Sequence, residues 1–464
     1  MVPRRTFALV AALALLGGCA SEPPAVKNNT VVPTAAAPAE IGGELTMWYG
    51  VDANTEKARK DYETWYIDPY KKMYPKVTVD AVPNVASTLK QKVKTALAAG
   101  RGPDFIETPG SSDAVPYAQA GYLADLGPLA DKEGWKDRIL PWAYDMGVID
   151  GKFQAVPLYY ESLVLFYNKT LFEKNGWTPP TDRASLEKLA DEMQAKGIIP
   201  FVNGNATYQG ATDWLVSSFM NGYAGPTRIH DALTGKLPFT DQAFVDSIQL
   251  LTDYFKKGYF AGGPKEYFTL QDPQKYAMLA EGKGAMLISG SWEFGALDQY
   301  FKPAGQEWAE VALPPLAPGV PAEVYPLSVG GTISLNSRSK NLPAAAAYVS
   351  WMLNDVKSMW EATAAGQRLP LPISFTAADV PPGTDTKIVD HYQRINDASE
   401  KGAVGYTSWT SFGGKAEQYI VENIDKVVNG DMGAAAFCAG MDKAFKTDLA
   451  AGVIPPVYST TATG

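Results

Sequence analysis

Apolar and polar positions along the first part of the chain predict alternating strands and helices. Residues 44–50, 76–82 and 103–110 are short apolar or alternating runs, as expected for strands. Between them, residues 55–74 and 87–100 carry apolar positions three and four apart, as expected for helices with one buried face. This order predicts parallel strands joined by right-handed helical crossovers, and thus an α/β fold. The strand ends of such a sheet commonly form a ligand crevice.

The later chain continues the pattern without a repeat of fixed period. Residues 284–290 are an apolar strand that leads into a turn carrying Trp292. The length, 464 residues, is too great for one ordinary core and fits two lobes plus a tail. Amphipathic helices are predicted at residues 180–195, 241–260, 342–364 and 413–430.

The first residues are typical of an export signal. Arg4 and Arg5 precede an apolar stretch, residues 7–16, that is too short to span a bilayer as a mature helix. The stretch ends in Leu-Gly-Gly-Cys, which resembles the bacterial lipobox, with Cys19 as the lipidated residue. An ordinary signal peptide with a chance cysteine is the alternative. We expect a signal peptide over 1–18 and a lipidated, Pro- and Ala-rich tether over 19–43, which would anchor an extracytoplasmic protein to the membrane.

Composition excludes several classes of function. The formal net charge is −9 and the basic residues form no runs, so nucleic acid is not an expected partner. If Cys19 is lipidated, Cys438 has no cysteine to pair with, and its apolar surroundings favour a small buried side chain. The two histidines, His230 and His391, lack metal-ligand neighbours at helical spacing, so we expect neither a metal site nor a cofactor.

Several motifs, in order over about residues 44–440, resemble the carbohydrate-type extracellular solute-binding proteins of ABC importers, which include the maltose- and maltodextrin-binding proteins. The segments that carry the resemblance are ALAAGRGPDFIETPG, GYLADL, GKFQAVPLYYESLVLFYNKTLFEKNG, AEGKGAMLISGSW and YPLSVGGTISLNSRSKN. One departure is the pair Asp182 and Arg183, where the family often has a tryptophan and an acidic residue.

The resemblance implies a two-lobed α/β periplasmic-binding-protein-like fold with a central ligand cleft and three chain crossings, near residues 157–161, 328–333 and 368–373. One lobe would comprise 44–157 plus 331–370, and the other 158–330 plus 371–464. The resemblance also implies a small carbohydrate as ligand, the transmembrane subunits of an ABC importer as partners, and a monomer.

A sugar site needs aromatic plates and planar polar groups that bind pairs of hydroxyls. Most candidates follow strands or stand at the expected crossings; the alternative for each is core packing, a helix cap or, for the glycine, hinge flexibility. Glu161 and Trp292 match ligand-binding positions of the family, and Trp409 and Phe412 match a late aromatic plate that only one of them can supply. The remaining candidates are Trp48, Asp52, Glu107, Ser111, Tyr159, Gln209, Asp213, Gly330 and Arg368.

Two other functions remain open. A secreted glycosidase would use two carboxylates, but no acidic pair stands out and no nucleophile motif is present. The same fold could bind a non-sugar solute, such as ferric iron through the adjacent Tyr159 and Tyr160, or a glycerophosphodiester. Because the candidates are mainly acidic and aromatic, a neutral mono- or oligosaccharide is the leading hypothesis. Binding would close the two lobes and would not alter the sugar.

Overall fold

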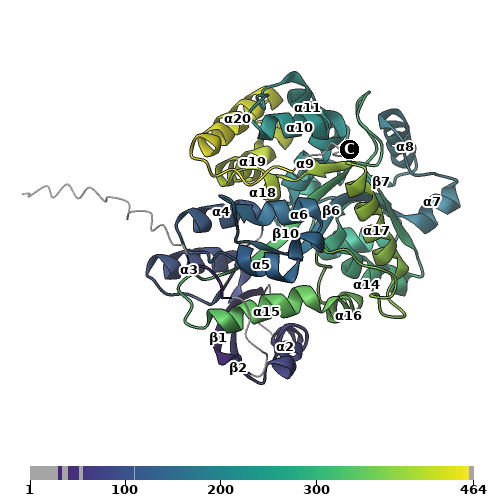
Figure 1. Cartoon of the computed structure of the whole chain (residues 1–464). Coiled ribbons are helices and arrows are strands. Elements are labelled where there is room, and N and C mark those ends of the chain that lie inside the picture. Colours follow the sequence, from purple (N-terminus) through teal and green to yellow (C-terminus); the bar gives the residue numbers. More distant parts are fainter. Residues whose placement is uncertain (1–29, 34–39, 52–55, 109, 459–464) are drawn as a thin grey trace, which may run out of the picture.

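The computed structural model describes residues 30–33, 40–51, 56–108 and 110–458 (Figure 1). Its centre is a mixed sheet in the order β2-β1-β3-β10-β6-β8-β7, with β11 paired to β10 and β9 paired to β6. The α/β fold expected from the sequence is therefore confirmed. The main strands are β1 (Gly42–Val51), β2 (Lys76–Val85), β3 (Phe105–Thr108), β6 (Val156–Asn168), β7 (Ile199–Phe201), β8 (Gly284–Gly290), β9 (Trp308–Val311), β10 (Tyr325–Leu335) and β11 (Val404–Tyr406).

The first strands pair as the sequence predicts. β1 lies parallel to both β2 and β3. Alternate residues of β1 face opposite layers of helices, as the two-residue period of a strand requires. Met47 belongs to the main core together with residues of α2 (Asp68–Met73) and α15 (Leu342–Asn354), whereas Trp48 packs beside α3 (Ala86–Ala98) and α4 (Ser111–Gln119).

Two long strands join the two halves of the sheet. The first part of β6 pairs antiparallel with β10, and its second part, from Leu163 onward, pairs with β8 and β9. In turn, β10 pairs with β11 at its start and with β3 at its end. Each of these strands therefore belongs to both halves. The coil at 368–373 lies beside them, because Pro370 O accepts a hydrogen bond from Tyr160 N.

Helices cover the second half of the sheet on both faces. β8 is buried along its whole length, which fits an apolar strand between two helical layers. Figure 1 shows α18, α19 and α20 grouped beside α9, α10 and α11. These and neighbouring helices are α7 (Lys169–Asn175), α8 (Arg183–Ala195), α9 (Ala211–Tyr223), α10 (Pro226–Leu233), α11 (Gln242–Lys256), α13 (Asp272–Ala280), α14 (Phe294–Ala304), α17 (Thr386–Glu400), α18 (Ser408–Ser411), α19 (Gly414–Val428) and α20 (Ala434–Ala450).

Two predicted helices are interrupted. The helix expected at 55–74 consists of α1 (Glu56–Tyr62), a π-helical turn (Glu63–Ile67) and α2. The helix expected at 342–364 is divided into α15 and α16 (Val356–Ala364), because Asp355 leaves the helical conformation and its carboxylate accepts a hydrogen bond from Ser358 N. An aspartate three residues before a serine is a usual N-terminal signal of a new helix.

The folded part begins earlier than the pattern predicted. We expected a tether to residue 43, but β1 starts at Gly42, and Val32 is 1% exposed. Val31 pairs with Asp125, and Val32 N donates a hydrogen bond to Asp125 O. In the part of the chain that the structure describes, no helix combines the length and the apolar character needed to cross a membrane. The predicted signal peptide and Cys19 lie outside the described residues.

Candidate ligand-binding site

Glu161 lies on β6, opposite β10, where the chain crosses between the halves of the sheet. Its carboxylate is 9% exposed and accepts a 2.9 Å hydrogen bond from Ser328 Oγ. A Cβ added at Gly330 would lie only 2.3 Å from Glu161 Cδ, so a glycine is needed for the carboxylate to fit against β10. Gly330 therefore allows the close approach of Glu161 to β10. The sequence had left open whether this glycine serves close approach or hinge flexibility.

Glu107 lies one residue before the end of β3, and its charge, like that of Glu161, acts on Tyr159. Tyr62 Oη donates a 3.4 Å hydrogen bond to Glu107 Oε1. Tyr62 stacks on Tyr49 at 3.7 Å and on Tyr66 at 4.7 Å between ring centroids, and the guanidinium of Arg368 lies 5.5 Å from the Tyr66 ring centre. The π-helical turn follows Tyr62 directly and contains Tyr66. We call Glu107, Tyr159, Glu161 and Arg368 the crossing-strand cluster.

Burial sets the charge state of this cluster. It raises the pKa of Glu107 to about 7, although the hydrogen bond from Tyr62 and the charge of Arg368 act in the opposite direction. It likewise raises the pKa of Glu161 to about 7, which the hydrogen bond from Ser328 partly offsets. Carboxyls with such pKa values are poorly hydrated and still lack donors for most of their lone pairs. Hydroxyl groups of a ligand can supply those donors.

A second group of carboxylates lies where the first turns of three helices meet. The charges of Asp113 of α4 and Asp213 of α9 act on Glu417 of α19, and all three acids act on Tyr208. The short helix α18 contacts both α4 and α19, and α9 contacts α19; Figure 1 shows α4, α18 and α19 side by side. We call these three acids the helix-end cluster. They come from segments one to three hundred residues apart in the chain.

Partners are unevenly distributed in the helix-end cluster. Asp113 forms a 2.5 Å ion pair with Lys90. Asp213 accepts a hydrogen bond from Ser408 Oγ on Oδ2, whereas its buried Oδ1 has no hydrogen-bond partner among the described residues. Burial raises the pKa of Asp213 to about 7. Burial and the charges of Asp113 and Asp213 raise the pKa of Glu417 to about 8.

Glycine precedes each of these three helices. Gly110, Gly210 and Gly413 are the N-cap residues of α4, α9 and α19, and none supplies a side-chain cap. A Cβ at Gly110 would lie 2.8 Å from Trp409 O, so the segments pack too closely for a larger residue. Ser111 Oγ, in the first turn of α4, is buried without a hydrogen-bond partner among the described residues.

A row of four aromatic rings lies beside the helix-end cluster. Trp214 stacks on Tyr208 with centroids 5.6 Å apart and lies 4.8 Å from Trp292, which in turn lies 6.2 Å from Trp409. The three tryptophans are half-buried, and Tyr208 is 59% exposed. We call Tyr208, Trp214, Trp292 and Trp409 the aromatic row.

A buried ion pair holds the turn that carries Trp292. Glu293 is 1% exposed and Lys275 is 2% exposed, and Lys275 Nζ lies 3.1 Å from Glu293 Oε1. Glu293 also accepts hydrogen bonds from Ser289 Oγ and Tyr276 Oη. These contacts hold the side chain of Glu293 in one position. They therefore also hold the backbone of the adjacent Trp292 in place.

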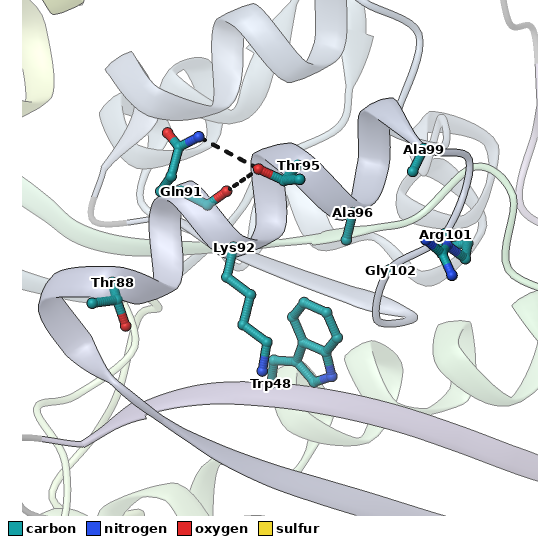
Figure 2. Close-up of a pocket in the computed structure, with 9 residues that line it drawn as sticks. All are labelled: Trp48, Thr88, Gln91, Lys92, Thr95, Ala96, Ala99, Arg101 and Gly102. Atoms are coloured by element: carbon teal, nitrogen blue, oxygen red, sulfur yellow. Dashed lines mark hydrogen bonds between the residues drawn. The ribbon is translucent and has the colours of Figure 1, made fainter.

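Three sequence candidates lie elsewhere, and one is not described. Trp48 faces α3, where its ring lies 4.4 Å from Lys92 Nζ in a cavity of about 780 Å³ (Figure 2). Phe412 is 3% exposed and stacks on Phe239, so it is a core residue and Trp409 is the aromatic that stays accessible. Gln209 is exposed and interacts with Asp425. Asp52 lies outside the described residues.

The remaining titratable candidates have structural partners. Tyr159 and Tyr160 point to opposite faces of β6, and Tyr160 is fully buried against Tyr392. His391 is buried between Glu310 and Ser162. Within the described ranges, no group of three histidine, cysteine or acidic residues could hold a metal ion.

Comparisons with known proteins agree with this architecture. The family model of the bacterial extracellular solute-binding protein matches residues 65–387. A probable sugar-binding periplasmic protein of Mesorhizobium japonicum is 29% identical over 226 residues, 47% of this chain and 51% of that protein. A diacetylchitobiose binding protein of Streptomyces coelicolor is 34% identical over 141 residues, 29% of each chain. The chain thus spans about half the length, or less, of these curated relatives.

Solved structures share the whole fold. A chitin oligosaccharide binding protein superposes with a TM-score of 0.72 at 19% identity, covering 88% of this chain and 99% of that one. The GacH receptor of Streptomyces glaucescens, solved unliganded and with acarbose, gives 0.69 at 23% identity, covering 88% and 98%. The fold is therefore the two-lobed one expected from the sequence. Since the family model covers more than half of the chain, the chain belongs to the bacterial extracellular solute-binding protein family.

Proposed function

We propose that this chain is the substrate-binding lipoprotein of an ABC-type sugar importer, which captures a mono- or oligosaccharide by lobe closure and delivers it to the membrane permease. The observation that carries the proposal is the aromatic row beside the helix-end cluster, together with the buried carboxylates of the crossing-strand cluster. The sugar-binding names of the relatives support it.

The chemistry of the side chains favours a saccharide. Aromatic faces bury the apolar C–H faces of sugar rings, and carboxylates accept hydrogen bonds from adjacent hydroxyls. Glu107 and Glu161 come from β3 and β6, the two strands that flank β10, and Arg368 is the cation whose charge acts on Glu107. A phosphodiester would require cationic donors in place of these acids, so it is disfavoured. Ferric iron bound by paired tyrosines is disfavoured because Tyr159 and Tyr160 face opposite ways.

We propose the lobe division implied by the resemblance, 44–157 plus 331–370 and 158–330 plus 371–464. With these boundaries, Glu107 and Asp113 belong to the first lobe, and Asp213, Trp292 and Glu417 to the second. Both lobes would then contact one ligand, which would stabilise the closed arrangement. The protein would act as a monomer that presents its closed form to the transmembrane subunits, and it would return the sugar unchanged.

The membrane attachment in this proposal rests on the amino-terminal sequence. Signal cleavage before Cys19 and acylation of that cysteine would anchor the protein outside the cytoplasm. Metabolic labelling with an alkyne fatty acid should mark the unchanged protein and not Cys19→Ser. Equal labelling of the two would refute the lipid anchor.

A thermal-shift screen of residues 20–464 tests the binding function. A ligand that binds only the folded state raises the melting temperature by an amount that grows with the logarithm of its concentration relative to its Kd. We expect a shift with one class of saccharide and none with ferric citrate or glycerophosphocholine. A shift with either non-sugar alone would overturn the sugar proposal, and release of a free monosaccharide from a bound glycoside would show an enzyme.

A further inference from the structure

We infer that the helix-end cluster is a subsite for the positively charged amino group of a saccharide, so that the ligand is an amino sugar and not a neutral one. The inference rests on the proposed function and names its substrate class. The residues that carry it are Asp113, Asp213 and Glu417, with Tyr208 beside them.

The three acids converge from different parts of the fold. Each occupies the first turn of its helix, and α4, α9 and α19 have 9, 13 and 15 residues. All three helices begin at glycine N-caps without side-chain caps. The charges of Asp113 and Asp213 disfavour ionisation of Glu417, so the charged form of Glu417 is costly in this setting. A cation that binds among them would remove this cost.

Lys90, the cation beside the helix-end cluster, does not neutralise all three acids. Lys90 pairs with Asp113, and its charge also acts to lower the pKa of Glu417, but its side chain is 62% exposed and the pKa of Glu417 is still raised. Asp213 and Glu417 form no ion pair among the described residues. The partial positive charge of a helix end, about half a unit, offsets only part of each carboxylate. Asp213 and Glu417 therefore remain available to a cationic group.

Two buried polar atoms indicate that a ligand completes the site. Asp213 is 3% exposed, yet its Oδ1 has no partner in the described part of the chain. Ser111 is fully buried in the same helical turn as Asp113, and its Oγ is also unpartnered there. An ammonium group has three donors and could satisfy carboxylate oxygens of this kind.

The aromatic row also favours a positively charged ligand. The Tyr208 ring covers the start of α9, because a Cβ at Gly210 would lie 2.5 Å from it. Tyr208 stacks on Trp214, which follows Asp213 directly. Aromatic faces attract cations as well as sugar C–H groups. A protonated amine on a sugar ring stacked on the aromatic row would therefore contact both aromatic faces and carboxylates.

Related saccharides test the inference, since the members of each set differ in whether they carry an amine. The first set is cellobiose, chitobiose and diacetylchitobiose, which carry a hydroxyl, an ammonium and an acetamide at carbon 2. The others are galactose, galactosamine and galacturonic acid, and maltotetraose with acarbose, whose secondary amine bridges two rings. We expect isothermal titration calorimetry at pH 7 to show that at least one amine-bearing saccharide has a Kd at least tenfold lower than that of its neutral counterpart.

Glu417→Gln should remove this preference. Losing one charge-assisted contact should weaken binding of the amine-bearing saccharide about 10- to 100-fold while the neutral counterpart changes little. The control is Glu422→Gln on α19, because Glu422 is exposed and contacts Gln418. Asp213→Asn should act like Glu417→Gln if both carboxylates hold the amine.

The outcomes separate the inference from the proposed function. If each neutral saccharide binds as tightly as its amine-bearing counterpart, the inference is overturned but the proposed sugar-binding function is not. The same holds if a preference for the amine-bearing saccharide persists in Glu417→Gln. Preference for galacturonic acid would overturn it in favour of an anion site. Silence from every saccharide would overturn both.

Discussion

Replacing Trp292 by alanine would remove the central ring of the aromatic row. The centroid of this ring lies 4.8 Å from that of Trp214 and 6.2 Å from that of Trp409, and the ring packs directly against Gly290, where an added Cβ would lie 2.1 Å from it. A sugar stacked on an indole buries roughly 100 Å² of apolar surface, worth about 2.5 kcal/mol at about 25 cal/mol per Å². This corresponds to an increase of about 70-fold in the Kd.

The assay is calorimetric titration with the saccharide that the thermal screen identifies. Trp177→Ala is the matched control, because Trp177 is half-buried and packs on Phe172, away from the aromatic row. Both variants should lose some stability, but only Trp292→Ala should lose affinity. A Kd within threefold of the unchanged protein would refute the assignment of Trp292 as a ligand plate.

Three further changes test other parts of the site and core. Burial raises the pKa of Glu161 above its unfolded value of about 4.3, so the folded state binds the proton more tightly and the stability falls as pH rises from about 4.5 to 7. Glu161→Gln should reduce that fall by up to about 3 kcal/mol in denaturant titrations from pH 4 to 8; an unchanged pH profile would contradict the pKa. Lys275→Met leaves Glu293 buried and uncompensated and should cost about 3–5 kcal/mol in chemical denaturation, whereas the double variant with Glu293→Leu should recover part of it. Burial raises the pKa of Cys438 to about 12, so a maleimide should label it only after unfolding; fast labelling of the folded protein would refute its burial.

Local periodicity predicted the strands and helices of the first half well. β1, β2 and β3 lie where the alternating or apolar runs placed them, and they pair in parallel as the helical connections required. The π-helical turn after Tyr62 has no such signal, because an inserted residue does not disturb the apolar spacing enough to be seen. The break at Asp355 could have been predicted from its spacing to Ser358.

The site was predictable only in part. Glu107 could be proposed because it lies where a predicted strand meets its loop, whereas Glu161 and Trp292 were proposed from their match to positions of the resembled family. Asp113 and Glu417 were missed, because an acid in the first turn of a helix is ordinarily a favourable partner of the helix dipole. Their convergence depends on the packing of distant helices, which no local pattern encodes.

Trp409 and Phe412 illustrate the same limit at short range. Both are aromatic and only three residues apart, so composition could not separate them. In the structure, α18 turns Phe412 toward Phe239 and Phe445, while Trp409 remains beside Trp292. The choice is made by Phe239 and Phe445, from distant parts of the chain.

The position of Glu161 would link the proposed ligand contact to the proposed lobe closure. On β6, the pairing with β10 ends at Ser162 and the pairing with β8 starts at Leu163, so Glu161 lies within two residues of the point where the strand changes partners. The hydrogen bond from Ser328 and the space at Gly330 both belong to β10, the other crossing strand. A ligand donor that ionises Glu161 would alter charge and hydrogen bonding between the strands that the proposed closure would flex. Because those strands are also shared by both halves of the sheet, ligand binding at Glu161 would be coupled to the proposed movement of the lobes.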